Sequence, residues 1–210
     1  MKTRDRILEA SRLLFNEEGE ADQSAVDIAN VLNISPGNLY YHFKGKDAII
    51  RALYDEFDAE MRIVLAGSRG RIRSIEDNWV YAYILLEETY DFRFFYRNLG
   101  PLLDRYPDLA GRFRRLVKDK RAAIRAILTE LSATGVIYLE DQLADALTDQ
   151  LLKTVVFWLS LEQIEESGLP PAHLIHKTVF QMMLLVVPYM GAEGEIVLRR
   201  MIKYYERAVH

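Results

Sequence analysis

Apolar residues recur along this chain at the three- and four-residue spacing of a helix. No useful stretch alternates with the two-residue period of a strand. The first helix carries Ile7, Leu8, Leu14 and Phe15 on one face and ends at Gly19. The same pattern predicts further helices at about 25–32, 36–43, 47–65, 75–91, 92–98, 108–133, 141–167, 171–189 and 195–209. The chain is therefore predicted to be all-α.

The N-terminal helices are short and are separated by tight turns. Ser24 and Asp27 have the spacing of a capping box, and Asn33 tolerates the left-handed conformation at a helix exit. Pro36 fits the first turn of a third helix. Two short helices that follow a longer one in this way form a candidate helix-turn-helix. A plain three-helix bundle is the alternative that spacing alone leaves open.

Composition narrows the class of protein. The chain has 210 residues, of which 50% are hydrophobic and 28% charged, and this argues against a disordered chain or a membrane protein. It has no cysteine, which excludes disulfides, thiolate metal sites and cysteine nucleophiles. The start lacks a signal-peptide pattern, and the apolar run at 179–190 is too short for a bilayer. We expect a cytoplasmic protein with no membrane contact.

Residues 33–46, NISPGNLYYHFKGK, contain no acid although the net charge of the chain is -4. A surface that approaches the DNA polyanion closely is expected to avoid acids. Yet residues 1–46 hold six basic residues against seven acids. Shape and hydrogen bonds at a chosen sequence are therefore expected to matter more than bulk charge.

Within this segment, compact residues at the start of the third helix permit close approach, and the amide of Asn38 suits a base edge. The predicted DNA-contacting residues are Ser24, Ser35, Pro36, Gly37, Asn38, Tyr40, Tyr41, His42, Lys44 and Lys46. Leu39 and Phe43 are predicted to be core. Three alternatives stay open: one tyrosine packs inward, His42 is a packing residue, and Lys44 is an ordinary surface lysine.

The stretch SAVDIANVLNISPGNLYYHFKGKDAII closely resembles the DNA-binding region of TetR-type transcriptional repressors. The resemblance covers about the first 55 to 60 residues. It departs from the family at Asn33, where glycine is common, and at Glu20, where an apolar residue is common. It implies a DNA-binding domain at 1–46 and a larger helical ligand-binding and dimerisation domain at 47–210.

The same resemblance implies a homodimer on a palindromic double-stranded DNA operator, with the third helix in the major groove. It also implies a small-molecule effector that binds the C-terminal domain and releases the DNA. Repressor function is the prediction, and a helical interaction module that does not bind DNA is the alternative. Binding of operator DNA distinguishes the two.

Aromatic residues concentrate between residues 79 and 96, as is typical of ligand pockets and also of ordinary core. The residues predicted to contact the effector are Trp79, Tyr83, Phe94, Tyr96 and Trp158. The charge of the effector stays open. Asp77, Glu87 and Glu88 favour a cation, whereas the run 105–125, with eight basic residues and two acids, favours an anion such as an acyl-CoA. That run is also typical of a DNA-backbone contact or a solvated face.

The helices at 141–167 and 171–189 are densely apolar, and residues 179–187 are apolar nearly all round. Such helices must be buried on more than one face. We predict that these two helices, residues 141–189, form the homodimer interface. A large core within one chain is the alternative.

No catalytic site is expected, since the sequence has neither a glycine-rich phosphate loop nor a G-x-S-x-G motif. His173 and His176 offer two nitrogens, which make a poor metal site. We therefore predict no enzyme activity, no metal and no cofactor.

Overall fold

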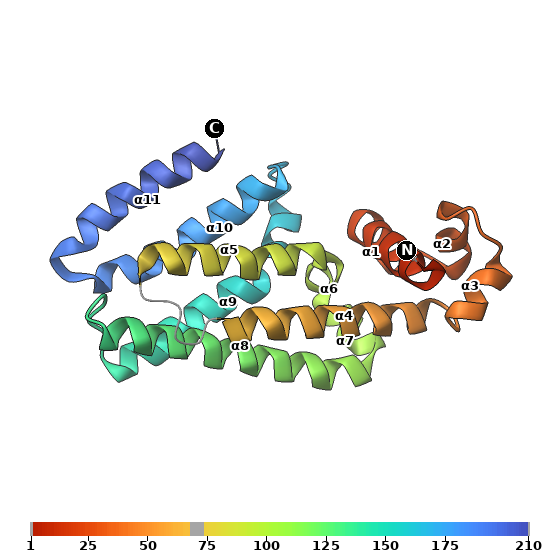
Figure 1. Cartoon of the computed structure of the whole chain (residues 1–210), viewed down its shortest axis with the longest axis horizontal. Coiled ribbons are helices and arrows are strands. Elements are labelled where there is room, and N and C mark those ends of the chain that lie inside the picture. The colour runs from red at the N-terminus through yellow and green to blue at the C-terminus, as the bar shows by residue number, and fades with distance from the viewer. Residues whose placement is uncertain (1, 68–73, 210) are drawn as a thin grey trace.

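The computed structural model describes residues 2–67 and 74–209, and within them every regular element is helical (Figure 1). The α-helices are α1 (Thr3–Glu18), α2 (Ala25–Val31), α3 (Pro36–His42), α4 (Lys46–Gly67), α5 (Ile75–Asp91), α6 (Arg93–Arg97), α7 (Leu99–Arg105), α8 (Pro107–Ala133), α9 (Asp141–Glu165), α10 (Pro171–Val186) and α11 (Gly194–Val209). Two 3₁₀ turns, η1 (Val187–Tyr189) and η2 (Gly191–Glu193), connect α10 to α11. The all-α prediction is confirmed.

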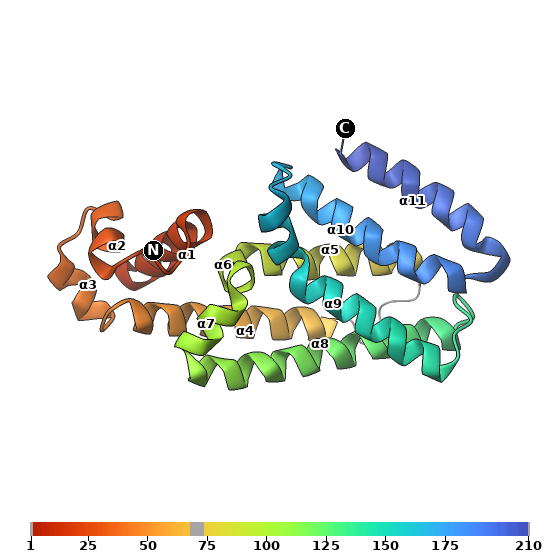
Figure 2. The same cartoon turned by 180° about the vertical axis from the view of Figure 1, so that it is seen from behind.

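Helices α1, α2 and α3 form a small head at one end of the molecule, and α5 to α11 form the body (Figures 1 and 2). The head closes around apolar positions of the sequence pattern: Ile7, Phe15, Ile28, Leu39 and Phe43 are all buried. Helix α4 leaves the head and runs on into the body. Its first residue adjoins the predicted domain boundary at 46/47, and that division stays a prediction.

Local hydrogen bonds hold the ends of the short head helices. The Ser24 hydroxyl accepts from the backbone N–H of Asp27, and the Asp27 carboxylate accepts from the backbone N–H of Ser24, so the capping box is closed. The Ser35 hydroxyl accepts from the backbone N–H of Asn38 at the start of α3. Asn33 has φ 53°, the left-handed conformation expected at this turn. Side-chain caps of this kind stabilise a helix by about 1 kcal/mol each.

The body is a bundle in which α5, α8, α9 and α10 enclose the core, and α11 packs on α10 at its outer side (Figures 1 and 2). The short helices α6 and α7 lie between this bundle and the head. No helix within the described ranges is both long enough and apolar enough to cross a bilayer.

Candidate nucleic-acid interface and effector site

Helix α3 has one buried side and one open side. Leu39 and Phe43 are buried in the core of the head, as predicted. Tyr40 and Tyr41 are 47% and 81% exposed, so neither tyrosine packs inward. His42 is half-buried and meets the Tyr41 ring edge-on, with centroids 5.1 Å apart. The outer surface of α3 thus presents both phenols to a partner.

The start of α3 is fully accessible. Ser35, Pro36, Gly37 and Asn38 are exposed, and so is Lys44 just beyond the helix. A Cβ built on Gly37 would meet only the Ser35 hydroxyl, at 3.9 Å. Its φ is not positive, so nothing within the chain requires glycine at this position. An unneeded glycine on an open surface leaves room for close approach by a partner.

Two of the predicted DNA contacts are engaged inside the head. The Lys46 ammonium donates to the carbonyls of Glu20 and Ala21, at 2.8 and 3.3 Å. The Ser24 hydroxyl donates to the Asp27 carboxylate at 2.5 Å. Hydrogen bonds from the Ser24 side chain and backbone lower the pKa of Asp27, which keeps a negative charge at this helix start. Ser24 and Lys46 reach DNA only if these bonds are exchanged, and their role stays a prediction.

Glu20, one of the departures from the family pattern, is only 3% exposed. Its carboxylate lies 3.0 Å from the guanidinium of Arg105 on α7 and 4.0 Å from the Lys46 ammonium. A buried charge is stable only when it is paired. Ion pairing therefore replaces apolar packing here and ties the head to α7. The sequence shows an acid where an apolar residue is common but does not show its partner.

Asn16 makes a second contact between head and body, and the sequence did not predict this role. Its side chain is buried; the amide nitrogen donates to the Asp91 carbonyl at 2.8 Å and the amide oxygen accepts from the Phe94 N–H at 3.1 Å. Its backbone carbonyl accepts from Arg97 at 2.8 Å. The contacts of Asn16 and Glu20 with α5, α6 and α7 are called the junction below. They fix the end of α1 to the body.

The aromatic residues predicted to hold an effector do not surround one cavity. Trp79 packs against Tyr204 of α11 with ring centroids 5.0 Å apart, and Tyr83 packs against His176 of α10 at 4.7 Å. Trp158 of α9 faces Tyr90, at 6.3 Å. These side chains serve three different helix contacts.

The two remaining residues of that set, Phe94 and Tyr96, lie on α6. Phe94 packs against Phe15 of α1, at 5.4 Å between ring centroids, and so belongs to the contact with the head. Tyr96 is fully buried between α4 and α8, with its ring 5.8 Å from that of Phe57 and 5.6 Å from that of Phe113. Helix α6 therefore touches both the head and the centre of the body.

Tyr96 is bound by a buried lysine. Lys120 of α8 is 1% exposed, and its ammonium donates to the Tyr96 hydroxyl at 2.8 Å. Burial lowers the pKa of Lys120 to about 7, and the nearby charge of Glu88 acts in the opposite direction. Burial also raises the pKa of Tyr96 well above its usual value. The body thus contains a cation in a largely apolar interior.

The rest of the basic run behaves differently from Lys120. Arg112 pairs with Asp55 of α4 at 2.6 Å, and Arg125 pairs with Asp141 of α9 at 2.9 Å. Arg121 is paired with Asp149. Several charges of the run 105–125 are thus compensated by neighbouring helices, as on a solvated face, and Lys120 alone of those named here points inward.

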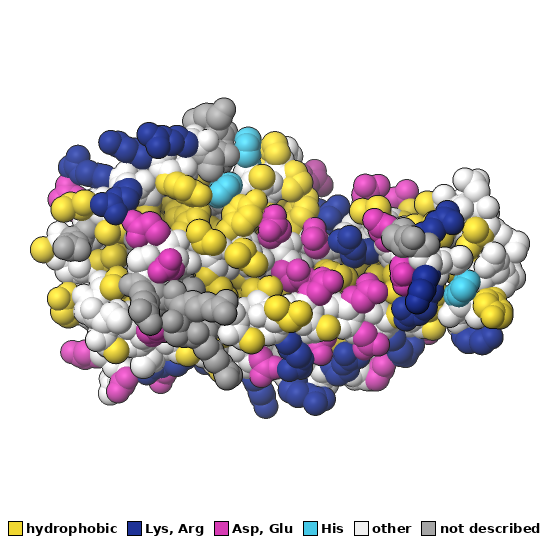
Figure 3. All heavy atoms as spheres, in the orientation of Figure 1, with side chains coloured by type: hydrophobic (Ala, Val, Ile, Leu, Met, Phe, Trp, Pro, Cys, Tyr) yellow, Lys and Arg dark blue, Asp and Glu magenta, His cyan; other side chains and the backbone are white. Residues whose placement is uncertain are grey.

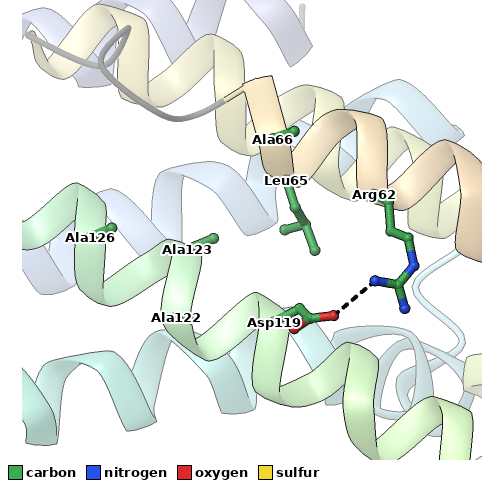
Figure 4. Close-up of a pocket in the computed structure, with 7 residues that line it drawn as sticks. All are labelled: Arg62, Leu65, Ala66, Asp119, Ala122, Ala123 and Ala126. Carbon is green, nitrogen blue, oxygen red and sulfur yellow. Dashed lines mark hydrogen bonds and ion pairs between the residues drawn. The ribbon is translucent and has the colours of Figure 1, made fainter.

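Three hollows of the body bear on effector binding. An open cleft of about 330 Å³ lies between α4 and α8, where Arg62 faces Asp119 and α8 presents alanines (Figure 4). A hollow of about 140 Å³ lies between α5 and α11 and includes Trp79, the one predicted effector residue that lines any of the three. A cavity of about 30 Å³ lies inside the bundle of α5, α8, α9 and α10.

Apolar side chains remain exposed on the two helices predicted to dimerise. On α9, Phe157, Leu161 and Ile164 are 55%, 55% and 79% exposed, and their spacing places them on one face. On α10, Leu184 and Leu185 are 40% and 37% exposed. Apolar residues are also visible over α5 and α11 (Figure 3).

Comparisons with known proteins agree with the order of head and body. A family profile described as "Bacterial regulatory proteins, tetR family" matches residues 7–53, and one described as "Bacterial transcriptional repressor" matches residues 56–196. The HTH-type transcriptional regulator UidR of Escherichia coli is 47% identical over 51 residues, 24% of this chain and 26% of that protein. The match thus spans about a quarter of that curated relative.

Solved structures resemble the whole chain. A TetR-family transcriptional regulator from Marinobacter aquaeolei VT8 is 31% identical, with a TM-score of 0.86 over 100% of both chains. The SmeT protein in its complex with triclosan is 17% identical, with a TM-score of 0.64 over 91% of this chain and 93% of that one. This second likeness concerns the fold.

Proposed function

Since this chain belongs to the TetR family of bacterial transcriptional regulators, we propose that it is a cytoplasmic, ligand-responsive repressor that binds a palindromic operator as a homodimer. Regulators of this family bind DNA and small-molecule effectors and act as dimers. They are not enzymes, which confirms the prediction that this chain is not an enzyme. The operator, the effector and the repressor role of this particular chain are the proposal.

The observation that carries the proposal is the open surface of α3. Its first turn is compact and its phenols stand free of the head core, with no acid in residues 33–46. In the proposed complex, Asn38 reads a base edge, while Tyr40 and Tyr41 donate to phosphates and set the register. Gly37 lets the helix approach the groove closely.

Dimerisation is proposed through α9 and α10, with two helices from each copy. The exposed apolar stripe of Phe157, Leu161 and Ile164 supports this, because such a stripe gains stability when a second copy covers it. A twofold axis through this interface would place the two heads on half-sites separated by whole turns of DNA.

Release is proposed to pass through α6. This helix binds the core of the body through Tyr96 and the head through Phe94. A ligand that shifts α6 changes the junction and so the placement of the head relative to the partner's head. The operator then binds the ligand-free arrangement of the two heads better than the ligand-bound one.

Tyr41→Ala tests the proposed DNA surface. Wild-type protein is used to select genomic fragments, and the affinity of both proteins for the recovered fragment is measured by gel shift. We expect affinity to fall about tenfold, because one hydrogen bond to a charged phosphate is lost. Tyr138→Ala is the matched control, since Tyr138 is 73% exposed and lies in the body.

Unchanged affinity of Tyr41→Ala would remove Tyr41 from the interface. If the wild-type protein selects no fragment at all, the DNA-independent interaction module becomes the better account.

A further inference from the structure

Lys120 has fewer partners than a buried ammonium requires. It carries three N–H donors, and in the described part of the chain the Tyr96 hydroxyl is its one hydrogen-bond acceptor. No carboxylate of the described residues lies within 4 Å of it. Burying a charge with one neutral partner is costly. The buried Lys120 ammonium lacks an anionic partner and is therefore a candidate to bind the anionic group of a ligand.

Lys120 lies one helical turn beyond the residues that line the cavity inside the bundle, on the side of the head. On α8, Ile124 lines this cavity and Lys120 lies one turn away on the same face. On α5, Leu85 lines it, and the buried Thr89 follows one turn later in the direction of the head. On α9, the Ser160 hydroxyl donates to the Tyr96 carbonyl at 2.8 Å. Lys120 of α8 and Thr89 of α5 thus lie one turn beyond the apolar cavity, on the side of the head, and Ser160 contacts the backbone of Tyr96.

The cavity wall suits an apolar molecule and is able to widen. It is lined mainly by aliphatic side chains, together with Met182 and Met183 of α10. Its volume of about 30 Å³ is far below the roughly 300 Å³ or more of a typical small-molecule site, so a ligand requires side chains to move. The two methionines have three rotatable side-chain bonds each, which makes such movement inexpensive.

We propose that Lys120 binds the carboxylate of an amphipathic effector whose apolar body occupies the widened cavity. The inference rests on the proposed function, because it names the chemical class of that effector. A carboxylate matches the single charge of one lysine. A doubly charged phosphate would bring a second, uncompensated charge into the core.

The open cleft between α4 and α8 is a weaker candidate for the same head group. Its cation is Arg62, which already pairs with Asp58 at 3.1 Å. Arg62 also pairs with Asp119 at 3.3 Å (Figure 4). The charge of Arg62 is therefore compensated within the chain. Lys120, by contrast, has no ion pair among the described residues, and the Glu88 carboxyl acts on it only from a greater distance.

The position of Lys120 also explains how binding reaches the head. A carboxylate at the ammonium competes with the Tyr96 hydroxyl, which is part of α6. Because Phe94 of α6 packs on α1, movement of Tyr96 is passed to the junction.

The test uses three probes with one apolar body and different heads: decanoate, 1-decanol and decylamine. Affinities are measured by isothermal titration calorimetry for the wild type, Lys120→Met, Arg62→Met and Lys118→Met. Lys118 is an exposed lysine of the same helix and is the matched control. We expect the wild type to bind decanoate about tenfold or more tightly than decanol, and decylamine most weakly. Lys120→Met loses this preference, and the other two variants keep it.

The proposal is overturned if Lys120→Met keeps the preference for decanoate, or if Arg62→Met loses it. It is equally overturned if the wild type binds the three probes alike or binds none. The wild-type measurements alone can overturn the proposal, even if the Lys120→Met variant does not fold. Operator binding without any probe tests the proposed function separately, so a protein that binds its operator and ignores decanoate contradicts the Lys120 proposal alone.

Discussion

At the scale of single residues, two buried charges are accommodated in different ways. Glu20 is paired with Arg105 and Lys46 at the junction. Lys120 has a hydroxyl partner, and its pKa falls to about 7 because burial penalises the charged form. The ion pairs of Glu20 hold the head against α7. The Lys120 ammonium, by contrast, is close to losing its proton at neutral pH.

The lowered pKa of Lys120 makes the stability of the fold depend on pH. Between pH 7 and about 10, the unfolded chain holds a proton on this lysine that the folded chain does not hold. Raising the pH therefore favours the folded state, by up to about 1.4 kcal/mol per pH unit. Lys120→Met lacks this contribution. Urea unfolding at pH 7, 8 and 9 should show the wild type gaining stability relative to Lys120→Met as the pH rises.

Lys118→Met is the control for this series, because Lys118 is an exposed lysine of the same helix and its substitution removes one positive charge as well. A constant difference between the wild type and Lys120→Met would show that the folded-state pKa of Lys120 is not lowered.

Residue type alone predicted some of these features and not others. The left-handed Asn33 and the buried pair Leu39 and Phe43 follow from local rules, and the structure confirms them. Lys120 was placed in a basic run, although it sits four residues from Leu116 and four from Ile124 on an apolar stripe. A lysine inside such a stripe is the signal that predicts burial. Its partner Tyr96 lies on another helix, which periodicity cannot show.

At the scale of elements, the strongly periodic helices were predicted well and their ends less well. The helix predicted at 171–189 ends at Val186, because Pro188 cannot continue it and the chain enters the turn η1. Helix α7 was not predicted, since its sequence contains Gly100 and Pro101. Proline is tolerated in a first turn, where its missing N–H has no partner in the helix. The helix that was missed, α7, is one that contacts the head, through Arg105, whereas α6 was predicted to within a residue at each end.

Asn16→Ala tests the junction. The change leaves the buried Phe94 N–H without its partner and removes one of the two donors of the Asp91 carbonyl, which keeps its bond from Arg12. We expect the free energy of unfolding to fall by about 1 to 3 kcal/mol. Asn30→Ala is the matched control: Asn30 is exposed on α2, and its substitution should cost less than about 0.5 kcal/mol. Equal losses in urea unfolding for the two variants would contradict the proposed role of Asn16.

At the scale of the whole molecule, the sequence predicted the all-α class and the order of head and body, since both follow from helix periodicity and from one specific motif. It did not predict how the body arranges its aromatic residues. Trp79, Phe94 and Trp158 each sit at a different helix contact, because packing between distant helices decides which face meets which neighbour. The proposed site at Lys120 therefore became visible only once the helices were packed.

The measurement that tests the central claim most directly is a footprint of the wild-type protein on its selected genomic fragment. We predict two protected half-sites related by twofold symmetry, with their centres about one turn of DNA, or a multiple of it, apart. Leu161→Glu should abolish the paired protection by charging the apolar stripe of α9, whereas Ile63→Glu, at an isoleucine of α4 that is 74% exposed, should keep it. A single asymmetric protected site would contradict the claim that a repressor binds its operator as an α9–α10 dimer. Paired protection by Leu161→Glu equal to that of the wild type would contradict it as well.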